Sequence, residues 1–93
     1  MLSSLQPVLM RTLVNDWLND IGETSLFADG FDDAIIGLSY DPLAGAYRVC
    51  YSIDKCHECL VNDGEMSLDE AIEFFEYNVI GSYVGPETPI FVI

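Results

Sequence analysis

The beginning of the chain repeats its apolar residues at the spacing of an α-helix. Hydrophobic side chains recur every three or four positions from Val8 to Ile21, and polar side chains fill the positions between them. Pro7 is tolerated before the first turn of such a helix, and Gly22 stands where glycine commonly ends one. The pattern predicts an amphipathic helix over residues 8–21.

A loop and a β-hairpin are predicted next. Residues 23–33 contain a glycine and several aspartates without a regular period, which is typical of a loop or short turn. Two short runs rich in aliphatic and aromatic residues, 34–40 and 47–53, are separated by a segment that contains Pro42 and Gly45. This arrangement predicts two antiparallel strands joined by a loop longer than the tightest hairpin turn.

A short helix and a final strand are predicted from local signals. Asp54 is placed to cap a helix that runs to about Asn62, and Gly64 would stop it. The last four residues, 90–93, are all apolar. We expect them to form a strand that is buried beside the hairpin, because a fully apolar strand is poorly suited to a free sheet edge.

The best-marked element is a helix over residues 68–80. Ser67 and Glu70 have the S-x-x-E spacing of a capping box, in which both side chains accept hydrogen bonds from backbone N–H groups that the first helical turn leaves unpaired. Gly81 is the expected C-terminal stop. At about 100° per residue, the helix has an apolar arc and an opposite acidic arc. The apolar arc comprises Leu68, Ala71, Ile72, Phe75 and Val79.

Together these elements predict a single α+β domain over residues 1–93. We expect a small antiparallel sheet of about three strands, made of the hairpin and the C-terminal strand, packed with about three helices in the order αββααβ. The chain is near the lower end of the size range for one domain. Its hydrophobic fraction of 51% is sufficient for a core that needs neither a metal nor disulfides.

The charge balance is the unusual feature of the composition. Sixteen Asp and Glu residues face three cations, Arg11, Arg48 and Lys55, and the net charge is −13. Such self-repulsion destabilises a compact chain, and it is compatible with halophilic solvation, with solubility, with drift or with binding. A strongly acidic surface is repelled by nucleic acid and by anionic membranes and is attracted to basic protein surfaces, including those that normally hold phosphates. The charge therefore indicates a protein partner.

Two groups of residues are candidates for contact with that partner. The first group lies in and just before the predicted helix over 68–80, on its acidic side, and includes one aromatic residue: Asp63, Glu65, Asp69, Glu70, Glu73, Glu76 and Tyr77. The second group lies in the preceding loop: Asp29, Asp32 and Asp33. The alternative for the first group is an ordinary solvated helix face, although such a face usually carries some lysine and this one has none. The alternatives for the second group are a solvated loop and a calcium site, but the EF-hand pattern is absent.

The residues that most often perform chemistry are few. Cys50, Cys56, His57 and Cys59 form one cluster of soft ligands, for which core or surface thiols, a zinc site and a redox role are the alternatives. The chain has one histidine, no glycine-rich phosphate loop and no G-x-S-x-G or H-E-x-x-H motif. We therefore expect a non-enzymatic protein with no catalytic residues, no bound metal and no cofactor.

Three segments resemble a group of short proteins encoded by bacteriophages and prophages. These are Gly30–Gly37, Tyr51–Cys56 and Gly64–Ile93, which lie within the last two thirds or so of the chain, and the resemblance is strongest in the capped helix, the N-V-I-G-S-Y-V-G run and the T-P-I-F ending. Small acidic phage proteins of this kind are similar to anti-defence inhibitors, including anti-CRISPR proteins, some of which imitate double-stranded DNA. The resemblance implies a phage context, and the analogy in charge and size to such inhibitors predicts a basic channel of a host complex as the target.

These observations predict an anti-defence inhibitor of the anti-CRISPR type, which uses a DNA-mimicking acidic surface to block DNA access to an effector complex. The expected partner is the basic nucleic-acid-binding surface of a CRISPR effector protein, with no direct contact to nucleic acid or membrane, and the protein is expected to be a monomer. The alternative is a phage adaptor or regulator that binds a host protein through an apolar or aromatic patch. Residues 1–7 lack the pattern of a signal peptide, and we expect the protein to act in the cytoplasm of the bacterial host.

Overall fold

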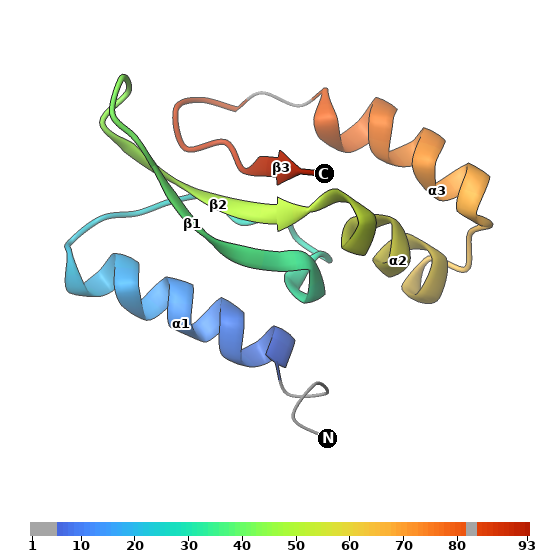
Figure 1. Ribbon diagram of the computed structural model, residues 1–93, viewed down its shortest axis with the longest axis horizontal. Helices are drawn as coiled ribbons and strands as arrows, with labels where there is room; N and C mark the ends of the chain where they lie inside the picture. The colour runs from blue at the N-terminus through green and yellow to red at the C-terminus, as the bar shows by residue number, and fades with distance from the viewer. Residues whose placement is uncertain (1–5, 82–83) are drawn as a thin grey trace.

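The computed structural model describes residues 6–81 and 84–93, and in this part of the chain three helices and three strands follow the predicted order αββααβ (Figure 1). The predicted α+β fold is confirmed. The helices and strands are α1 (Gln6–Asp20), β1 (Ile35–Asp41), β2 (Ala46–Ser52), α2 (Ile53–Asp63), α3 (Leu68–Phe75) and β3 (Ile90–Val92). Two single turns accompany them: a 3-10 turn, η2 (Asp32–Ala34), and a π turn, η3 (Glu76–Ile80), which continues α3.

The hairpin of β1 and β2 forms as predicted. The two strands are antiparallel, with Tyr40 opposite Tyr47, and the register shifts between Ile35 and Gly37. In the connecting loop the carboxylate of Asp41 accepts hydrogen bonds from the backbone N–H groups of Leu43 and Ala44. Gly45 completes the turn with a φ of 64°, a left-handed conformation that glycine adopts without strain.

The last strand differs from the prediction in direction and in position. β3 pairs with β2 in parallel, with Phe91 beside Tyr51, so the sheet is mixed and not wholly antiparallel. The reason is the path of the chain, which leaves the C-terminal end of β2, passes through α2 and α3 and re-enters the sheet at the end where β2 begins, as a crossover between parallel strands requires. The strand order is β1-β2-β3, so β3 is an edge strand and is not buried as expected. Val92 is 41% exposed and Ile93 is fully exposed.

The helix ends follow local capping. Ser52 caps α2 by accepting a hydrogen bond from the backbone N–H of Lys55, so the predicted cap at Asp54 is wrong by two residues. Asp54 instead lies in the first turn, where its negative charge is favoured by the helix dipole. The predicted capping box of α3 is present in full, and Gly81 follows the π turn.

The core is built around aromatic rings. Phe75 of α3 has no exposed surface, and its ring meets Phe31, His57 and Phe91 edge-on at centroid distances of 6.0, 5.2 and 5.3 Å. Tyr51 of β2 is also fully buried, and its hydroxyl oxygen accepts a hydrogen bond of 2.8 Å from the backbone N–H of residue 28. These contacts attach α3 to the sheet, to α2 and to the loop before β1.

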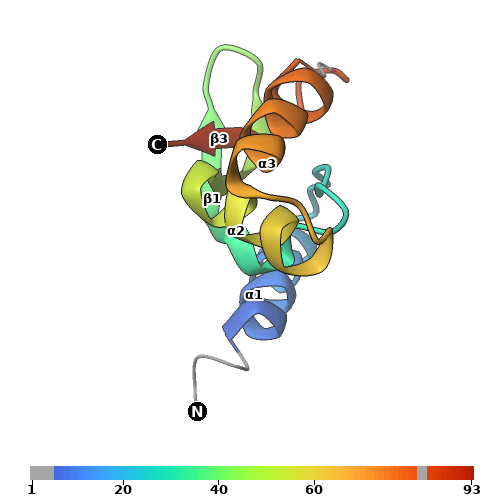
Figure 2. The same ribbon diagram turned by 90° about the vertical axis from the view of Figure 1, so that its right-hand side faces the viewer.

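The molecule is flat. On one side of the molecule α1 packs against β1, and on the opposite side α2 and α3 pack against each other (Figures 1 and 2). Its extents are 40 × 34 × 18 Å. The radius of gyration of 13.6 Å exceeds the roughly 12 Å expected for a compact chain of this length. A flat shape leaves little interior, so many large apolar side chains remain on the surface.

Candidate functional site

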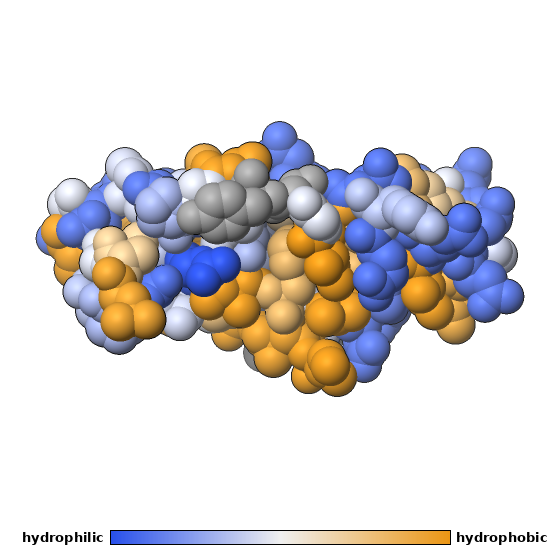
Figure 3. All heavy atoms as spheres, turned by 90° about the horizontal axis from the view of Figure 1, so that it is seen from above, coloured by the Kyte–Doolittle hydropathy of each residue, from blue (hydrophilic) through white to orange (hydrophobic). Residues whose placement is uncertain are grey.

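The acidic face predicted for the helix over residues 68–80 points outward; it lies on α3 and continues on η3 with Glu76 and Tyr77, and we call the whole of it the α3 face. Asp69, Glu70, Glu73 and Glu76 are all exposed, whereas Ala71 and Phe75 on the opposite side have no exposed surface. Viewed from above, hydrophilic surface gathers over the part of the molecule that contains α3 (Figure 3). The apolar arc is less deeply buried than expected, since Leu68 is 58% and Ile72 38% exposed. The helix is therefore held to the core by few side chains and presents most of its circumference to solvent.

The capping box fixes the start of this face. The hydroxyl of Ser67 accepts a hydrogen bond of 3.2 Å from the backbone N–H of Glu70, and the Glu70 carboxylate accepts one of 2.9 Å from the backbone N–H of Ser67. These hydrogen bonds lower the pKa of the Glu70 carboxyl. The one that its carboxylate accepts from the backbone N–H of Ser67 has the largest effect. The carboxylate is therefore ionised at neutral pH, at the helix end where the dipole favours negative charge.

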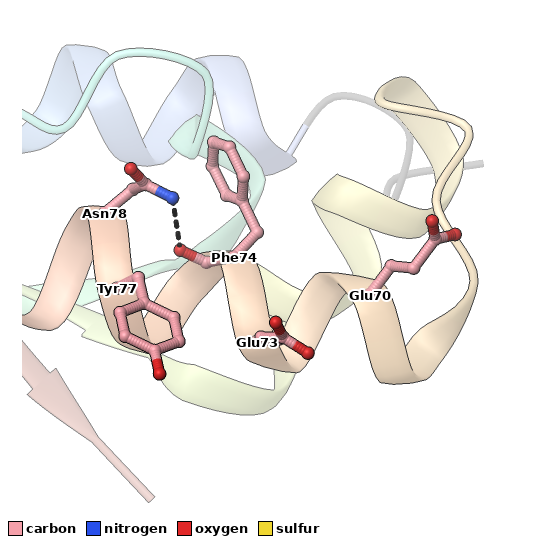
Figure 4. Close-up of a pocket in the computed structure, with 5 residues that line it drawn as sticks. All are labelled: Glu70, Glu73, Phe74, Tyr77 and Asn78. Atoms are coloured by element: carbon pink, nitrogen blue, oxygen red, sulfur yellow. Dashed lines mark hydrogen bonds between the residues drawn. The ribbon is translucent and has the colours of Figure 1, made fainter.

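Aromatic side chains lie between the acids. Tyr77 is 80% exposed and Phe74 is 40% exposed. With Glu70, Glu73 and Asn78 they line an open hollow of about 480 Å³ along the helix (Figure 4). In Figure 4, Tyr77 and Glu73 project from the same side of the helix, and the amide of Asn78 donates a hydrogen bond of 3.1 Å to the backbone carbonyl of Phe74. The hollow therefore combines negative charge with two aromatic surfaces.

Few of the carboxylates are neutralised within the molecule. In residues 6–81 and 84–93, two ion pairs form: Arg11 with Asp32 at 2.7 Å and Arg48 with Asp41 at 3.9 Å. The guanidinium of Arg11 also lies over the ring of Phe27, at 4.0 Å from its centroid. Both arginines are thus engaged near the sheet and α1, away from α3. The acids of α3 form no ion pair in the described part of the chain.

The second acidic group is not uniform. Asp29 and Asp33 are exposed, as a binding role requires. Asp32 is half-buried, and its pairing with Arg11 links η2 to α1 across 21 positions of sequence. Its charge is therefore largely neutralised within the fold, and its observed contact is structural.

Some members of both acidic groups lie near Cys59 of α2. Burial raises the pKa of the Cys59 thiol to about 11, and four carboxylates near it raise the pKa further. They are Asp33, Asp63, Glu58 and Asp32, in decreasing order of effect. Asp33 belongs to the loop group and Asp63 to the helix group, so these two members of different groups lie near the same thiol. Glu58, which also lies near this thiol, was not among the predicted residues.

The cysteines behave as apolar core residues. Burial raises the pKa of Cys56 to about 12, and the neighbouring Cys59 raises it further, so both thiols are protonated at neutral pH. His57 packs edge-on against Phe75, and its Nε2 atom is buried without a hydrogen-bond partner. Among the described residues, no three His, Cys, Asp or Glu side chains are arranged to hold a metal ion.

Phe74 is a residue of the hollow on α3 that was not among the candidates predicted from the sequence. Its position on the helical wheel lies between the apolar arc and the acidic arc, at the border of Glu70 and Tyr77. A large aromatic residue at such a border was the signal available in the sequence. The structure shows it beside the acids and partly exposed.

The chain matches no protein-family model, no curated protein and no solved structure. None of the helices described here has both the length and the apolar character needed to cross a membrane. The arrangement on α3 is suited to binding positively charged groups, because its carboxylates are exposed and adjoin aromatic rings.

Proposed function

We propose that this protein is an anti-defence inhibitor of the anti-CRISPR type, which occupies the basic nucleic-acid-binding surface of an effector complex in the host cytoplasm and blocks access of DNA. The observation that carries the proposal is the outer face of α3. Asp69, Glu70, Glu73 and Glu76 are exposed there, the helix has no lysine or arginine, and these acids form no ion pair in the described residues.

The spacing of the acids supports an imitation of DNA. Glu73 follows Asp69 by four residues, a rise of about 6 Å along a helix. That rise is comparable in order of magnitude to the spacing between phosphates of one strand. The like charges also cost stability, by a few tenths of a kcal/mol for such a pair. Because these like charges lower the stability of the fold, their presence on one face favours a role for that face in binding.

The aromatic residues of α3 would add short-range contacts to the electrostatic attraction. Tyr77 and Phe74 offer exposed rings beside Glu70 and Glu73, and an arginine of the partner can stack on a ring while it pairs with a carboxylate. Long-range attraction would accelerate encounter, and these contacts would slow dissociation.

The resemblance to phage-encoded proteins determines which partners are tested. The experiment measures release of fluorescently labelled target DNA from a panel of purified CRISPR effector complexes as the protein is added. We expect the wild-type protein to displace DNA from at least one complex. The double variant Glu73→Lys/Glu76→Lys should need a concentration at least about 100-fold higher to displace the same amount of DNA, because two attractive contacts become repulsive.

A matched control carries the same change in net charge at another place. Glu23→Lys/Asp54→Lys reverses two exposed carboxylates outside α3. This variant should retain inhibition within about threefold, since only the general field changes. The proposal is wrong if the α3 variant inhibits as well as the control, or if no complex in the panel releases DNA.

A further inference from the structure

The apolar face of helix α1 is wider than the part of it that the fold buries. Val14 and Leu18 are 0% and 2% exposed and belong to the core. Leu13, Trp17 and Ile21, the last of which directly follows α1, recur every four residues beside the buried part and are 43%, 47% and 51% exposed. We name these three residues the α1 stripe. Helix α1 and helix α3 lie on opposite sides of the molecule (Figure 1).

The stripe is bordered by negative charge. Asp16 follows Leu13 by three residues and Asp20 follows Trp17 by three, so each carboxylate is a surface neighbour of a stripe residue. Both aspartates are exposed and form no ion pair in the described part of the chain. Arg11 is the cation of this helix, and it is engaged by Asp32 at 2.7 Å. The border of the stripe therefore has no positive charge of its own.

We propose that the α1 stripe is a docking site for a basic amphipathic helix of a partner protein. Apolar residues of that helix would cover Leu13, Trp17 and Ile21, and a row of lysine or arginine along one side would pair with Asp16 and Asp20. The stripe extends over about 12 Å, roughly two helical turns, which suits the i, i+4, i+7 anchors of a docked helix. Charge complementarity determines the partner and the orientation.

The same charges disfavour two other occupants. A second copy of the chain would bring two rows of aspartates together and would join two molecules of net charge −13. An anionic membrane surface would repel Asp16 and Asp20 where the stripe would have to enter. The docking site is separate from the α3 face, and it does not depend on whether that face binds an effector complex.

Trp17 provides a local signal for the test, because it is the single tryptophan of the chain and lies in the middle of the stripe. The probe is an 18-residue peptide with leucines at helical spacing and lysines along one side. We expect saturable binding that shifts the emission of Trp17 to shorter wavelength, because the peptide excludes water from the ring. A peptide with the same composition in scrambled order, and one with glutamate in place of lysine, should bind at least about tenfold more weakly.

Two variants separate the apolar contact from the charge contact. Leu13→Ser/Ile21→Ser should weaken binding at least about tenfold, whereas Leu43→Ser, at a hairpin position that is 98% exposed, should have no effect. Asp16→Lys/Asp20→Lys should reverse the preference, so that the glutamate peptide binds better than the lysine peptide. Circular dichroism of each variant verifies that the fold is retained. The charge variant changes only exposed side chains, so it remains informative if the apolar variant unfolds.

The proposal is overturned if the lysine peptide leaves the Trp17 emission unchanged, or if the scrambled peptide binds equally well. It is also overturned if Trp17 shifts with protein concentration alone and sedimentation shows a dimer, since a second copy would then cover the stripe. A shift caused by vesicles of phosphatidylcholine and phosphatidylglycerol, and not by the peptide, would assign the stripe to a lipid surface instead. Because Trp17 is remote from α3, Glu73→Lys/Glu76→Lys should leave the peptide signal intact, which distinguishes this result from failure of the α3 proposal.

Discussion

At the scale of single residues, Phe75 connects the acidic surface to the rest of the molecule. Its ring contacts Phe31 before β1, His57 of α2 and Phe91 of β3, and it has no exposed surface. Glu73 of α3 lies two positions before Phe75, and Glu76, the first residue of η3, lies one position after it. The position of these carboxylates therefore depends on an aromatic contact that joins three distant parts of the chain.

The buried thiols predict that stability falls in alkaline solution. The pKa of Cys56 is about 12 and that of Cys59 about 11 in the fold, against 9.0 for an unperturbed thiol, because burial disfavours the thiolate. Since the folded pKa values are higher, this contribution is fully present below about pH 9 and is lost as the pH rises toward 11 and 12. Urea unfolding at pH 8 and pH 10.5 under reducing conditions should show a decrease in the free energy of unfolding.

Cys59→Ala is the control for this effect, because it removes one of the two thiols. The decrease between the two pH values should be smaller in this variant than in the wild type. It should not vanish, since Cys56 remains and the pKa of Tyr51 is raised from 10.0 to about 12, mainly by burial. An equal decrease in both proteins would contradict the assignment to Cys59.

Residue-scale contacts between distant segments were not predictable from the sequence. The outward direction of Asp69 and Glu73 follows from helical periodicity, and the structure agrees. The pairing of Arg11 with Asp32 does not follow from helical periodicity, because it depends on how α1 packs beside η2. For the same reason, the sequence could not show that Asp33 and Asp63 lie near one thiol.

At the scale of elements, α3 is the helix whose start is best defined by local interactions. Replacing Ser67 by alanine removes the hydroxyl that accepts the hydrogen bond from Glu70 N. We expect Ser67→Ala to lower the free energy of unfolding by about 1 kcal/mol. Ser67→Asn keeps an acceptor at the cap and should stay within a few tenths of a kcal/mol of the wild type. Urea unfolding measures both, and equal stability of the two variants would show that the cap contributes nothing.

The elements that were predicted well are those with local signals. The capping box at Ser67 and the Pro- and Gly-containing loop of the hairpin are determined by residues close in sequence, so α3, β1 and β2 were predicted. The direction of β3 is determined by the crossover through α2 and α3, and its edge position by pairing with β2. Neither the direction nor the edge position of β3 has a local signal in the sequence. The apolar composition of residues 90–93 predicted a more deeply buried strand than the fold contains.

At the scale of the whole molecule, shape and charge act together. The flat fold buries few side chains and leaves apolar rows such as the α1 stripe on the surface. The net charge of −13 keeps such a molecule soluble, but it also opposes compaction. Two opposite regions result, an acidic aromatic face on α3 and an apolar face with an acidic border on α1. Partner surfaces with positive charge would complement both.

The self-repulsion predicts a stability signature of the α3 face. Glu73→Lys converts the unfavourable pair with Asp69 into an attractive one and lowers the net negative charge. Glu73→Lys/Glu76→Lys should therefore raise the free energy of unfolding by about 0.5–1 kcal/mol at 10 mM salt. The control Glu23→Lys/Asp54→Lys should gain less, because it relieves only the general field and removes a favourable charge from the first turn of α2. At 1 M salt, where the screening length is about 3 Å, the gain should disappear.

Thermal and urea unfolding at both salt concentrations measure this difference. If the α3 variant gains stability at low salt and loses inhibition of the effector complex, the acids of α3 act at the expense of the fold, which is the behaviour of a binding surface. A variant that loses stability at low salt would mean that Glu73 and Glu76 support the fold through favourable contacts. Their exposure would then be structural, and the imitation of DNA by α3 would lose its main support.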